Sequence, residues 1–375
     1  MKAEQGLRVG VVGCGYWGSK HVRTLLSLEA VSRVCVIDPS DERRSAVTRV
    51  YPRVDEFRTL GEALGQLDAV IIAAPPTLHA PLALEAIARG VHVLVEKPLA
   101  PTVKEGQAMV RAAEKKGVTL MVGHTFEYHS AVWELRSMVQ RGDLGDLYYL
   151  DTARLNLGLY QRDVNVVFDL APHDVSILNY VLGSSPSMVE CWGARNAHPR
   201  LEDVAQLRLY YDDPGVFANV HVSWLNPKKV REVTVVGSNK MVVFDDLKTE
   251  QRVKVHDKGV TAMTDGADLT AVPMSYRHGD IVSPYLEMNE PLRVEDEHFV
   301  TCVQTGLRPL TDGESGLEVV RVLEAAQRSM CDGVAVRLPA RTRDRAPAAP
   351  LVGAVPTSPV AEDALSGASR GKRAG

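Results

Sequence analysis

Short apolar runs of strand length alternate with segments of helical composition from Leu7 to Gly123. The runs end at glycine, proline or polar turn residues, and they cover residues 7–12, 31–37, 69–74, 91–95 and 118–122. Strands that are apolar on both faces are typical of a parallel sheet covered by crossover helices. Residues 1–123 are therefore predicted to form a doubly wound α/β domain, whose ligands bind beyond the carboxyl ends of the strands.

Capping residues mark the helix ends in this region. A first helix is predicted over residues 19–28, and Thr77 is expected to cap a later one. Thr102 and Glu105 fit a capping box that opens a third helix, which closes at Gly117.

After Gly123 the pattern changes to strands separated by turns instead of helices. Strands are predicted at 147–155, 204–211, 216–223, 232–236 and 241–245, and helices at 130–141, from about 169 to 183, and at 313–331. Residues 124–340 are therefore expected to form an α+β domain with a large, mostly antiparallel open sheet. An open sheet face commonly packs on a partner, so a homodimer or homotetramer is expected.

Composition narrows the class of protein further. A chain of 375 residues is long enough for two domains, and its formal net charge of -4 offers no positive field for nucleic acid. No apolar run approaches the roughly 20 residues of a membrane span, and a signal-peptide pattern is not seen. The five cysteines form no CxxC pair and are interpreted as reduced thiols, which favours a cytoplasmic protein. Residues 341–375, rich in Ala, Pro, Gly, Ser and Arg, are expected to be disordered.

A glycine-rich turn directly follows the first predicted strand, and it reads GxGxxG at Gly13, Gly15 and Gly18. The first glycine permits the turn, the second lets the backbone approach a pyrophosphate, and the third lets helix and strand pack closely. Asp38 lies about 20 residues further on, at the end of the next strand. The set predicts a dinucleotide-binding Rossmann domain, although the glycines could serve only a tight turn and Asp38 only a strand end.

Asp38 would accept hydrogen bonds from both ribose hydroxyls and repel a 2′-phosphate, so NAD is favoured over NADP. Arg43 and Arg44 are close enough in sequence to weaken that preference. His79 either helps to start its helix or contacts the cofactor. The other predicted cofactor contacts are Tyr16, Trp17, Pro75, Thr77, Glu96 and Lys97.

Two clusters of residues could carry chemistry. Lys97, in the sequence Glu-Lys-Pro, ends a sheet strand and could stabilise an alkoxide beside a nicotinamide, unless it is a solvated surface charge. Asp169 and His173 are four residues apart and share one helix face, with Pro172 suited to the first turn. His173 could act as a general base or acid, or be an ordinary core histidine. Asp174 is expected to assist the helix N-terminus.

Three polar aromatic residues follow the last strand of the first domain, and they could face the cleft between domains. Of His124, Tyr128 and His129, His124 is predicted to form a wall of the site. No set of His, Cys and carboxylate residues has metal-ligand spacing, so no metal is predicted.

These residues resemble the Gfo/Idh/MocA oxidoreductases, named for glucose-fructose oxidoreductase and inositol dehydrogenase, from about Leu7 to Leu338. The resemblance rests on the glycine turn, Glu96-Lys97-Pro98 and the Asp169 to His173 spacing. It implies that Lys97 and His173 are catalytic, that Asp169 is a supporting acid, and that the bond before Pro98 is cis.

Further motifs are similar to the branch of that family that acts on nucleotide-linked sugars, represented by UDP-N-acetylglucosaminuronate 3-dehydrogenases and sugar C3-ketoreductases. They lie at 122–126, 154–158, 163–165, 169–174 and 290–293. The resemblance makes Arg154, Asn156 and Asn165 candidate substrate contacts, since arginine can clamp a carboxylate or phosphate and amides can bind sugar hydroxyls. Arg154 could equally pair with an acidic neighbour.

The leading hypothesis is an NAD-dependent oxidoreductase that moves a hydride between the nicotinamide and a secondary carbinol of a sugar, at C3 of a nucleotide-linked sugar or uronate. A cyclitol dehydrogenase acting on free inositols is the second enzyme hypothesis. A non-catalytic dinucleotide sensor of the same fold is the rival from another class. The motifs specify neither the sugar nor the direction of hydride transfer.

Overall fold

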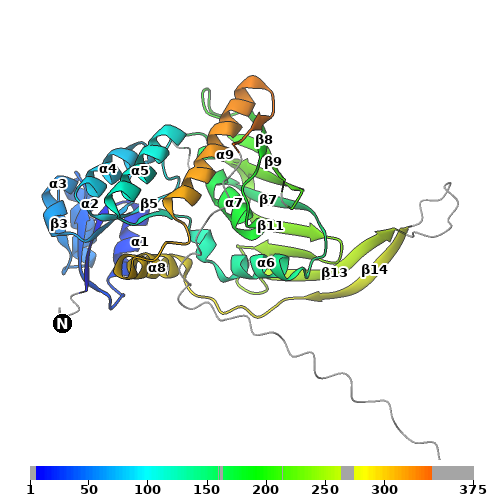
Figure 1. Ribbon diagram of the computed structural model, residues 1–375, viewed down its shortest axis with the longest axis horizontal. Coiled ribbons are helices and arrows are strands. Elements are labelled where there is room, and N and C mark those ends of the chain that lie inside the picture. Colours follow the sequence, from blue (N-terminus) through cyan, green and yellow to red (C-terminus); the bar gives the residue numbers. More distant parts are fainter. Residues whose placement is uncertain (1–5, 159, 161–163, 213, 263–273, 340–375) are drawn as a thin grey trace, which may run out of the picture.

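The computed structural model describes residues 6–158, 160, 164–212, 214–262 and 274–339. Two sheets lie side by side, and the long helix α9 (Gly313–Asp332) lies between them (Figure 1). The predicted tail at 341–375 and residue 163 of the nucleotide-sugar motifs are outside the described residues.

Among the described residues, the first sheet contains six strands, all parallel, in the order β3-β2-β1-β4-β5-β6. The strands are β1 (Leu7–Val12), β2 (Val31–Ile37), β3 (Asp55–Phe57), β4 (Ala69–Ile72), β5 (His92–Glu96) and β6 (Leu120–Gly123). The helices of this half are α1 (Tyr16–Leu25), α2 (Asp41–Val50), α3 (Leu60–Ala63), α4 (His79–Ala88) and α5 (Val103–Lys116), with short 3₁₀ turns η1 (Leu64–Gln66) and η2 (Pro76–Leu78). The doubly wound parallel sheet is thus confirmed.

Local capping signals predicted some helix ends correctly and others wrongly. The Thr102 hydroxyl accepts from the backbone N–H of Glu105, and Gly117 closes α5 in the left-handed conformation, as expected. Helix α1 begins earlier than predicted, directly after Gly15. Thr77 lies inside η2 and does not cap α4, because the 3₁₀ turn places it before the helix.

In the part of the chain that the structure describes, the second sheet has nine strands in the order β14-β13-β12-β11-β7-β10-β9-β8-β15, and only the β7–β10 pair is parallel. Its strands are β7 (Leu147–Leu157), β8 (Met188–Ala194), β9 (Val204–Tyr211), β10 (Val216–Ser223), β11 (Leu225–Gly237), β12 (Met241–Asp245), β13 (Val253–Ala262), β14 (Met274–Val282) and β15 (Val336–Arg337). The accompanying helices are η3 (Thr125–Tyr128), α6 (Ser130–Arg141), α7 (Val166–Leu182) and α8 (Pro291–Thr305). The mostly antiparallel sheet is confirmed, and α8 was not predicted.

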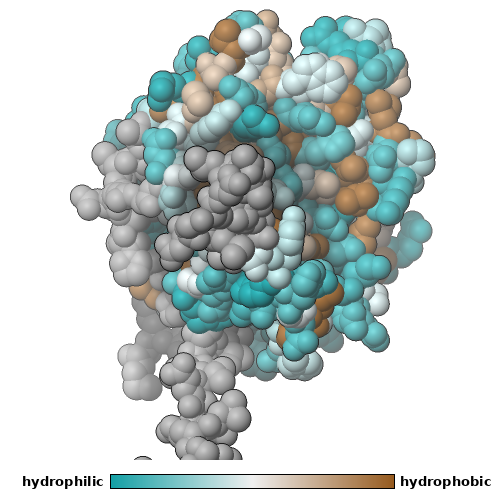
Figure 2. All heavy atoms as spheres, turned by 90° about the vertical axis from the view of Figure 1, so that its right-hand side faces the viewer, coloured by the Kyte–Doolittle hydropathy of each residue, from teal (hydrophilic) through white to brown (hydrophobic). Residues whose placement is uncertain are grey.

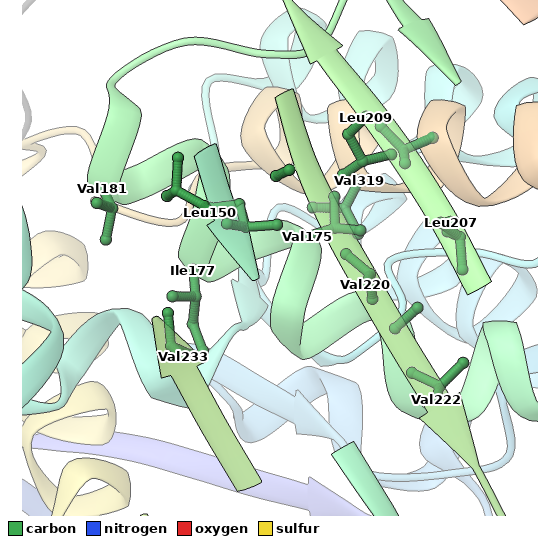
Figure 3. Packing of buried hydrophobic residues seen from close by; sticks show 14 of the residues in the cluster. Leu150, Val175, Ile177, Val181, Leu207, Leu209, Val220, Val222, Val233 and Val319 are labelled. Carbon is green, nitrogen blue, oxygen red and sulfur yellow. The ribbon is translucent and has the colours of Figure 1, made fainter. Parts of the chain in front are cut away.

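One face of this sheet is covered by α7 and by part of α9. Figure 3 shows Val175 and Ile177 of α7 packed among buried side chains of the strands, such as Leu150 and Val220. Along β7 the inward positions are Leu150, Thr152 and Arg154, all buried, while their neighbours are only partly so. The alternation of buried and partly buried residues therefore continues along β7 as far as Arg154, which is the last buried residue of the strand.

The end of the molecule that carries the β13–β14 hairpin has a mixed surface. In Figure 2, several groups of apolar side chains (brown) lie among mostly hydrophilic ones (teal) on that side. On β14, Tyr276 and Ile281 are examples of exposed apolar residues.

Segments after residue 123 return to complete the first domain. Leu317 and Val320 of α9 belong to the core beside the parallel sheet, whereas Val319 and Leu323 of the same helix belong to the core of the second sheet. Phe299 of α8 packs in the remaining core of the first half. The two halves therefore share helices, and α9 fixes their relative position by packing on both.

A buried ionic cluster joins α1, β5 and α8. The Nδ1 atom of His21 is 2.8 Å from Asp296, and its Nε2 atom is 3.2 Å from Glu96. Burial opposes a charge on this ring, but the two carboxylates outweigh it and raise the pKa of His21 well above its ordinary value. The imidazolium thus links α1 to the strand that precedes Lys97.

The tight turn at the start of α1 gives a stability prediction. A Cβ atom on Gly18 would lie 1.7 Å from the backbone oxygen of Gly13, so Gly18→Ala should force the turn apart and lower the free energy of unfolding by about 3 kcal/mol or more. A thermal unfolding scan would measure it. Gly65→Ala is the matched control, because a Cβ there meets no atom within 4 Å. Equal midpoints for the two variants would contradict the packing argument.

Candidate active site

A cavity of about 490 Å³ lies where the carboxyl end of β5 meets the second sheet. This is where parallel sheets place their ligands. It is lined by Trp17, Lys20, Glu96, Lys97, Thr125, Phe126, His129, Arg154, His173, Arg231, Asp246, Arg252, Met288, Asn289, Glu290, Pro291 and Leu292. The structure thus brings Lys97 and His173 from different halves to one cavity.

Lys97 reaches across to the N-terminal part of α7. Its Nζ atom donates to the backbone oxygen of Asp169 at 2.8 Å and lies 3.8 Å from the Asp169 carboxylate. That carboxylate also accepts from the indole N–H of Trp224 at 3.0 Å, which holds it in place. The peptide bond between Lys97 and Pro98 is cis, as the family resemblance implied.

Helix α7 begins at Val166, three residues before the predicted start. Asn165 is its N-cap, and the side-chain oxygen of Asn165 accepts from the N–H of Phe168. Pro172 therefore lies in the helix interior, not in the first turn, and this prediction was wrong. The asparagine cap, and not the proline, sets where the helix starts.

His173 lies one turn after Asp169 on α7 but is not paired with it through any hydrogen bond that the described residues show. The Asp169 carboxylate faces Lys97 and Trp224, while Nδ1 of His173 is buried without a partner. Its ring contacts the edge of Phe126, with 5.3 Å between centroids. Burial, then the charge of Lys97, lowers the pKa of His173 well below its ordinary value. The neutral imidazole is the form that accepts a proton.

Glu96, the residue before Lys97, also lines the cavity. Burial opposes its ionisation, but His21 outweighs burial and lowers the pKa of Glu96. One of its carboxylate oxygens accepts from the backbone N–H of Lys97 at 3.2 Å. Glu96 is thus a fixed anion that helps to set the position of Lys97.

The three aromatic residues after β6 separate in the fold. His129 lines the cavity, whereas His124 and Tyr128 are buried outside its lining. Neither ring nitrogen of His124 has a hydrogen-bond partner, and burial lowers its pKa to about 4. The Tyr128 hydroxyl is 2.8 Å from that of Thr311. The wall residue is therefore His129, one turn further along the chain than the His124 that was predicted.

Arg154 lines the cavity, but its guanidinium is already engaged. It donates two hydrogen bonds to Asp174, at 2.8 and 3.1 Å, and it lies over the ring of Phe126. Asp174 is buried within α7 and does not cap the helix, which corrects that prediction. The pairing of Arg154 with an acidic residue is thus confirmed, while its contact with a substrate stays a prediction.

The two predicted amide contacts lie outside the cavity lining. Asn165 is buried, and its side-chain NH₂ group donates to Glu202 and Gln327. Its cap and these bonds occupy the amide, so a substrate contact has no support at this position. Asn156 is partly buried near the end of β7 and is not part of the lining.

A second cleft, of about 770 Å³, lies along the glycine turn of the first domain. Gly13, Gly15, Asp38 and Pro75 are among its lining residues. Gly13 has a φ of 97°, and a Cβ there would come within 2.5 Å of the Ala73 oxygen. Gly15 faces open space, since no atom lies within 4 Å of its would-be Cβ. Because Gly15 has no side chain and faces open space, a pyrophosphate could approach its backbone closely.

The Asp38 side chain lines this cleft and is held in place by two backbone N–H groups. Its carboxylate oxygens accept from the N–H groups of Cys14 and Ser40, each at 2.9 Å. Arg44 is turned inward, where it donates to the backbone oxygen of Asp38. Arg43 is exposed, lines the cleft and lies 3.9 Å from Asp38. Only Arg43 of the two arginines is therefore placed to influence a 2′-phosphate.

The remaining predicted cofactor residues divide into exposed and buried ones. Tyr16 and Trp17 are exposed at the start of α1, where Lys20 lies over both rings. His79 is buried, and its two ring nitrogens are 2.8 and 2.9 Å from the backbone oxygens of Pro98 and Ala74. His79 thus joins the start of α4 to the segment after Lys97, and Thr77 lies beside it in η2.

Sequence reasoning missed a group of charges on the far wall of the cavity. Arg231 of β11, Asp246 after β12 and Arg252 before β13 line it together. These three residues belong to no local sequence motif, so no pattern along the chain identified them. The antiparallel pairing of β11 with β12 and of β12 with β13 brings them together. Glu290, from a motif noted in the sequence, also lines the cavity.

Within the part of the chain that the structure describes, no group of three or more His, Cys, Asp and Glu residues could hold a metal. All five cysteines are free thiols. No helix among the described residues is long and apolar enough to cross a membrane.

The chain is similar to known proteins over most of their length. The chain is 25% identical over 321 residues to UDP-N-acetylglucosamine 3-dehydrogenase of Acidithiobacillus ferrooxidans, covering 85% of this chain and 95% of the relative. It is 26% identical to scyllo-inositol 2-dehydrogenase (NAD(+)) of Bacillus subtilis, covering 89% and 97%. The crystal structure of GenD2 from gentamicin A biosynthesis in complex with NAD superimposes with a TM-score of 0.75 at 25% identity, covering 90% and 97%.

Two family models match successive parts of the chain. Residues 7–124 match the oxidoreductase family model with an NAD-binding Rossmann fold, and residues 132–243 match the model of the GFO/IDH/MocA C-terminal domain. Together they span more than half of the sequence, and their boundary falls where the parallel sheet ends. The chain belongs to the Gfo/Idh/MocA oxidoreductase family.

Proposed function

We propose that this protein is an NAD-dependent dehydrogenase or ketoreductase acting on a secondary carbinol, at C3, of a nucleotide-linked sugar or sugar uronate. The observation that carries the proposal is the presence of Lys97 and His173 on one cavity beside the dinucleotide cleft. The similarity to a UDP-N-acetylglucosamine 3-dehydrogenase supports the sugar and the carbon.

The cofactor would be held by the glycine turn and Asp38, and when bound it supplies the hydride acceptor or donor. Trp17 lines the catalytic cavity and Gly15 the dinucleotide cleft, so the start of α1 borders both. A dinucleotide whose pyrophosphate lies at Gly15 would therefore have its nicotinamide end directed toward Lys97.

Lys97 and His173 have complementary roles in this proposal. The Lys97 ammonium, held by Asp169, stabilises negative charge that develops on the substrate oxygen. The neutral His173 accepts the hydroxyl proton during oxidation, and its protonated form returns it during ketone reduction. Asp169 acts through Lys97 and is a positioning residue.

An inositol substrate is the second candidate, because the chain is as similar to a scyllo-inositol 2-dehydrogenase as to the nucleotide-sugar enzyme. UDP-sugars and free inositols, offered separately with NAD, would distinguish the two through the absorbance of reduced nicotinamide. NAD binding without turnover of either class would favour the non-catalytic sensor instead.

Replacement of Lys97 by methionine should remove charge stabilisation while keeping the side-chain length. We expect turnover to fall by about 10²-fold or more and NAD binding, measured by calorimetry, to stay within a factor of about two. Lys104→Met, at an exposed position on α5, is the matched control. Full turnover by K97M would remove Lys97 from the mechanism.

The pH dependence of oxidation tests the role of His173. Its lowered pKa means that the base form is already dominant at pH 6.5, so kcat/KM should decline only as the pH falls well below that value. The acidic limb should be absent from the residual activity of His173→Gln. A limb centred at or above pH 6.5, or one that persists in H173Q, would argue against this base.

Cofactor preference can be tested at Asp38. Asp38→Asn keeps the shape but removes the charge that repels a 2′-phosphate, so the ratio of kcat/KM for NAD over NADP should fall about tenfold, equivalent to ~1.4 kcal/mol. Arg43→Gln should raise the same ratio. Mass spectrometry of protein purified from its host should find NAD bound, and bound NADP would overturn the preference.

A further inference from the structure

The far wall of the catalytic cavity carries more positive than negative charge. Arg231 and Arg252 share a single carboxylate, that of Asp246, with which each forms one contact through Nη1, at 3.5 and 3.3 Å respectively. These distances are long for charge-assisted hydrogen bonds, which are typically about 2.7 to 2.9 Å. Among the described residues, one guanidinium charge is therefore left without a matching anion on this wall.

Both arginines also hold a buried donor that is not used. Among the described residues, the Nε–H group of Arg231 and that of Arg252 are buried and make no hydrogen bond. A buried donor without a partner costs about 1 to 3 kcal/mol, so the described part of the protein does not fully satisfy either guanidinium. Arg154, by contrast, uses two donors on Asp174.

The other charges of the cavity do not compensate the pair. Lys97 is matched by Asp169, Glu96 by His21, and Glu290 by Arg23. His129 lies 3.9 Å from Asp246, but burial lowers its pKa to about 4, so it adds no charge at neutral pH. Lys20, over Tyr16 and Trp17, is a further cation of the lining.

The arginine pair is close to the reacting centre. Arg231 lies opposite Arg154 in the pairing of β11 with β7, and Arg154 covers the ring of Phe126, which touches His173. The charge of Arg231 is also among those that lower the pKa of His173. Arg231 is therefore close to His173, and Arg252 lines the same cavity.

We propose that Arg231 and Arg252 bind an anionic oxygen group of the substrate, a carboxylate or a phosphate, while its carbinol lies between Lys97 and His173. This inference rests on the proposed function and restricts its substrates to acidic sugars. Two guanidinium groups offer the planar donors that carboxylates and phosphates prefer. Asp246 spaces the pair and competes with the ligand for its donors.

Calorimetry with the NAD-loaded protein tests the pair with four probes: glucose, glucuronate, UDP-glucose and UDP-glucuronate. We expect the acidic probes to bind at least tenfold more tightly than glucose, and Arg252→Gln or Arg231→Gln to remove that advantage. A loss confined to glucuronate and UDP-glucuronate would identify a ring carboxylate as the bound group. A loss that includes UDP-glucose would identify the phosphate of the carrier.

Asp246→Asn separates recognition from a structural role, because it removes the competing carboxylate and should strengthen binding of the acidic probes. Arg277→Gln, on β14 beside Asp257, is the control and should leave every affinity unchanged. Thermal unfolding of each variant reports whether it is folded.

Equal binding of glucose and glucuronate, unchanged affinity in R252Q and R231Q, or no binding of any acidic probe would overturn the inference. If K97M loses turnover but keeps its affinity for the acidic probes, the proposed function and the anion-binding inference are each supported. If the wild-type protein binds the acidic probes but turns over no sugar, only the proposed function is contradicted.

Discussion

The position of the candidate site depends on one buried imidazole. His21 projects from α1 and lies between Glu96, at the end of β5, and Asp296 of α8. Removing one member of such a buried ionic group leaves an uncompensated charge, at a cost of about 3 to 5 kcal/mol. Glu96 also accepts a hydrogen bond from the backbone N–H of Lys97. The ionic cluster that joins α1, β5 and α8 therefore also fixes the backbone position of Lys97.

Charges in the catalytic cavity are of two kinds. Lys97 and Arg154 each face an acid of α7, Asp169 and Asp174, so one helix holds a cation from each sheet in place. Arg231 and Arg252 instead share Asp246 and keep unused donors. Paired cations are suited to positioning, whereas an under-paired cluster is suited to a charged ligand. His173 remains neutral among these charges because burial and the surrounding cations both disfavour its protonation.

Whether a prediction agrees with the structure depends largely on how far apart in the chain the interacting residues lie. The five predicted strands of the first sheet, the capping box at Thr102 and the place of Lys97 at a strand end depend on residues close in sequence, and the structure bears them out, whereas the short edge strand β3 was not predicted. The start of α7 was misplaced because Pro172 was weighed without the capping asparagine at 165. His124 and His129 could not be told apart, because the 3₁₀ turn between them decides which ring faces the cavity. Asn165 has the residue type of a sugar contact, yet Glu202 and Gln327 occupy its amide.

By itself the sequence determined the periodicity that makes a parallel sheet followed by a mostly antiparallel one, the glycine turn, and the family to which those motifs point. Such features need only neighbouring residues, since strand and helix patterns repeat within a few positions. The tertiary structure alone decided that Asp169 faces Lys97 and not His173, that Arg154 is engaged by Asp174, and that Arg231 and Arg252 share Asp246 on one wall of the cavity. Those contacts join segments far apart in the chain, and packing and burial of charge select them, which no local pattern encodes.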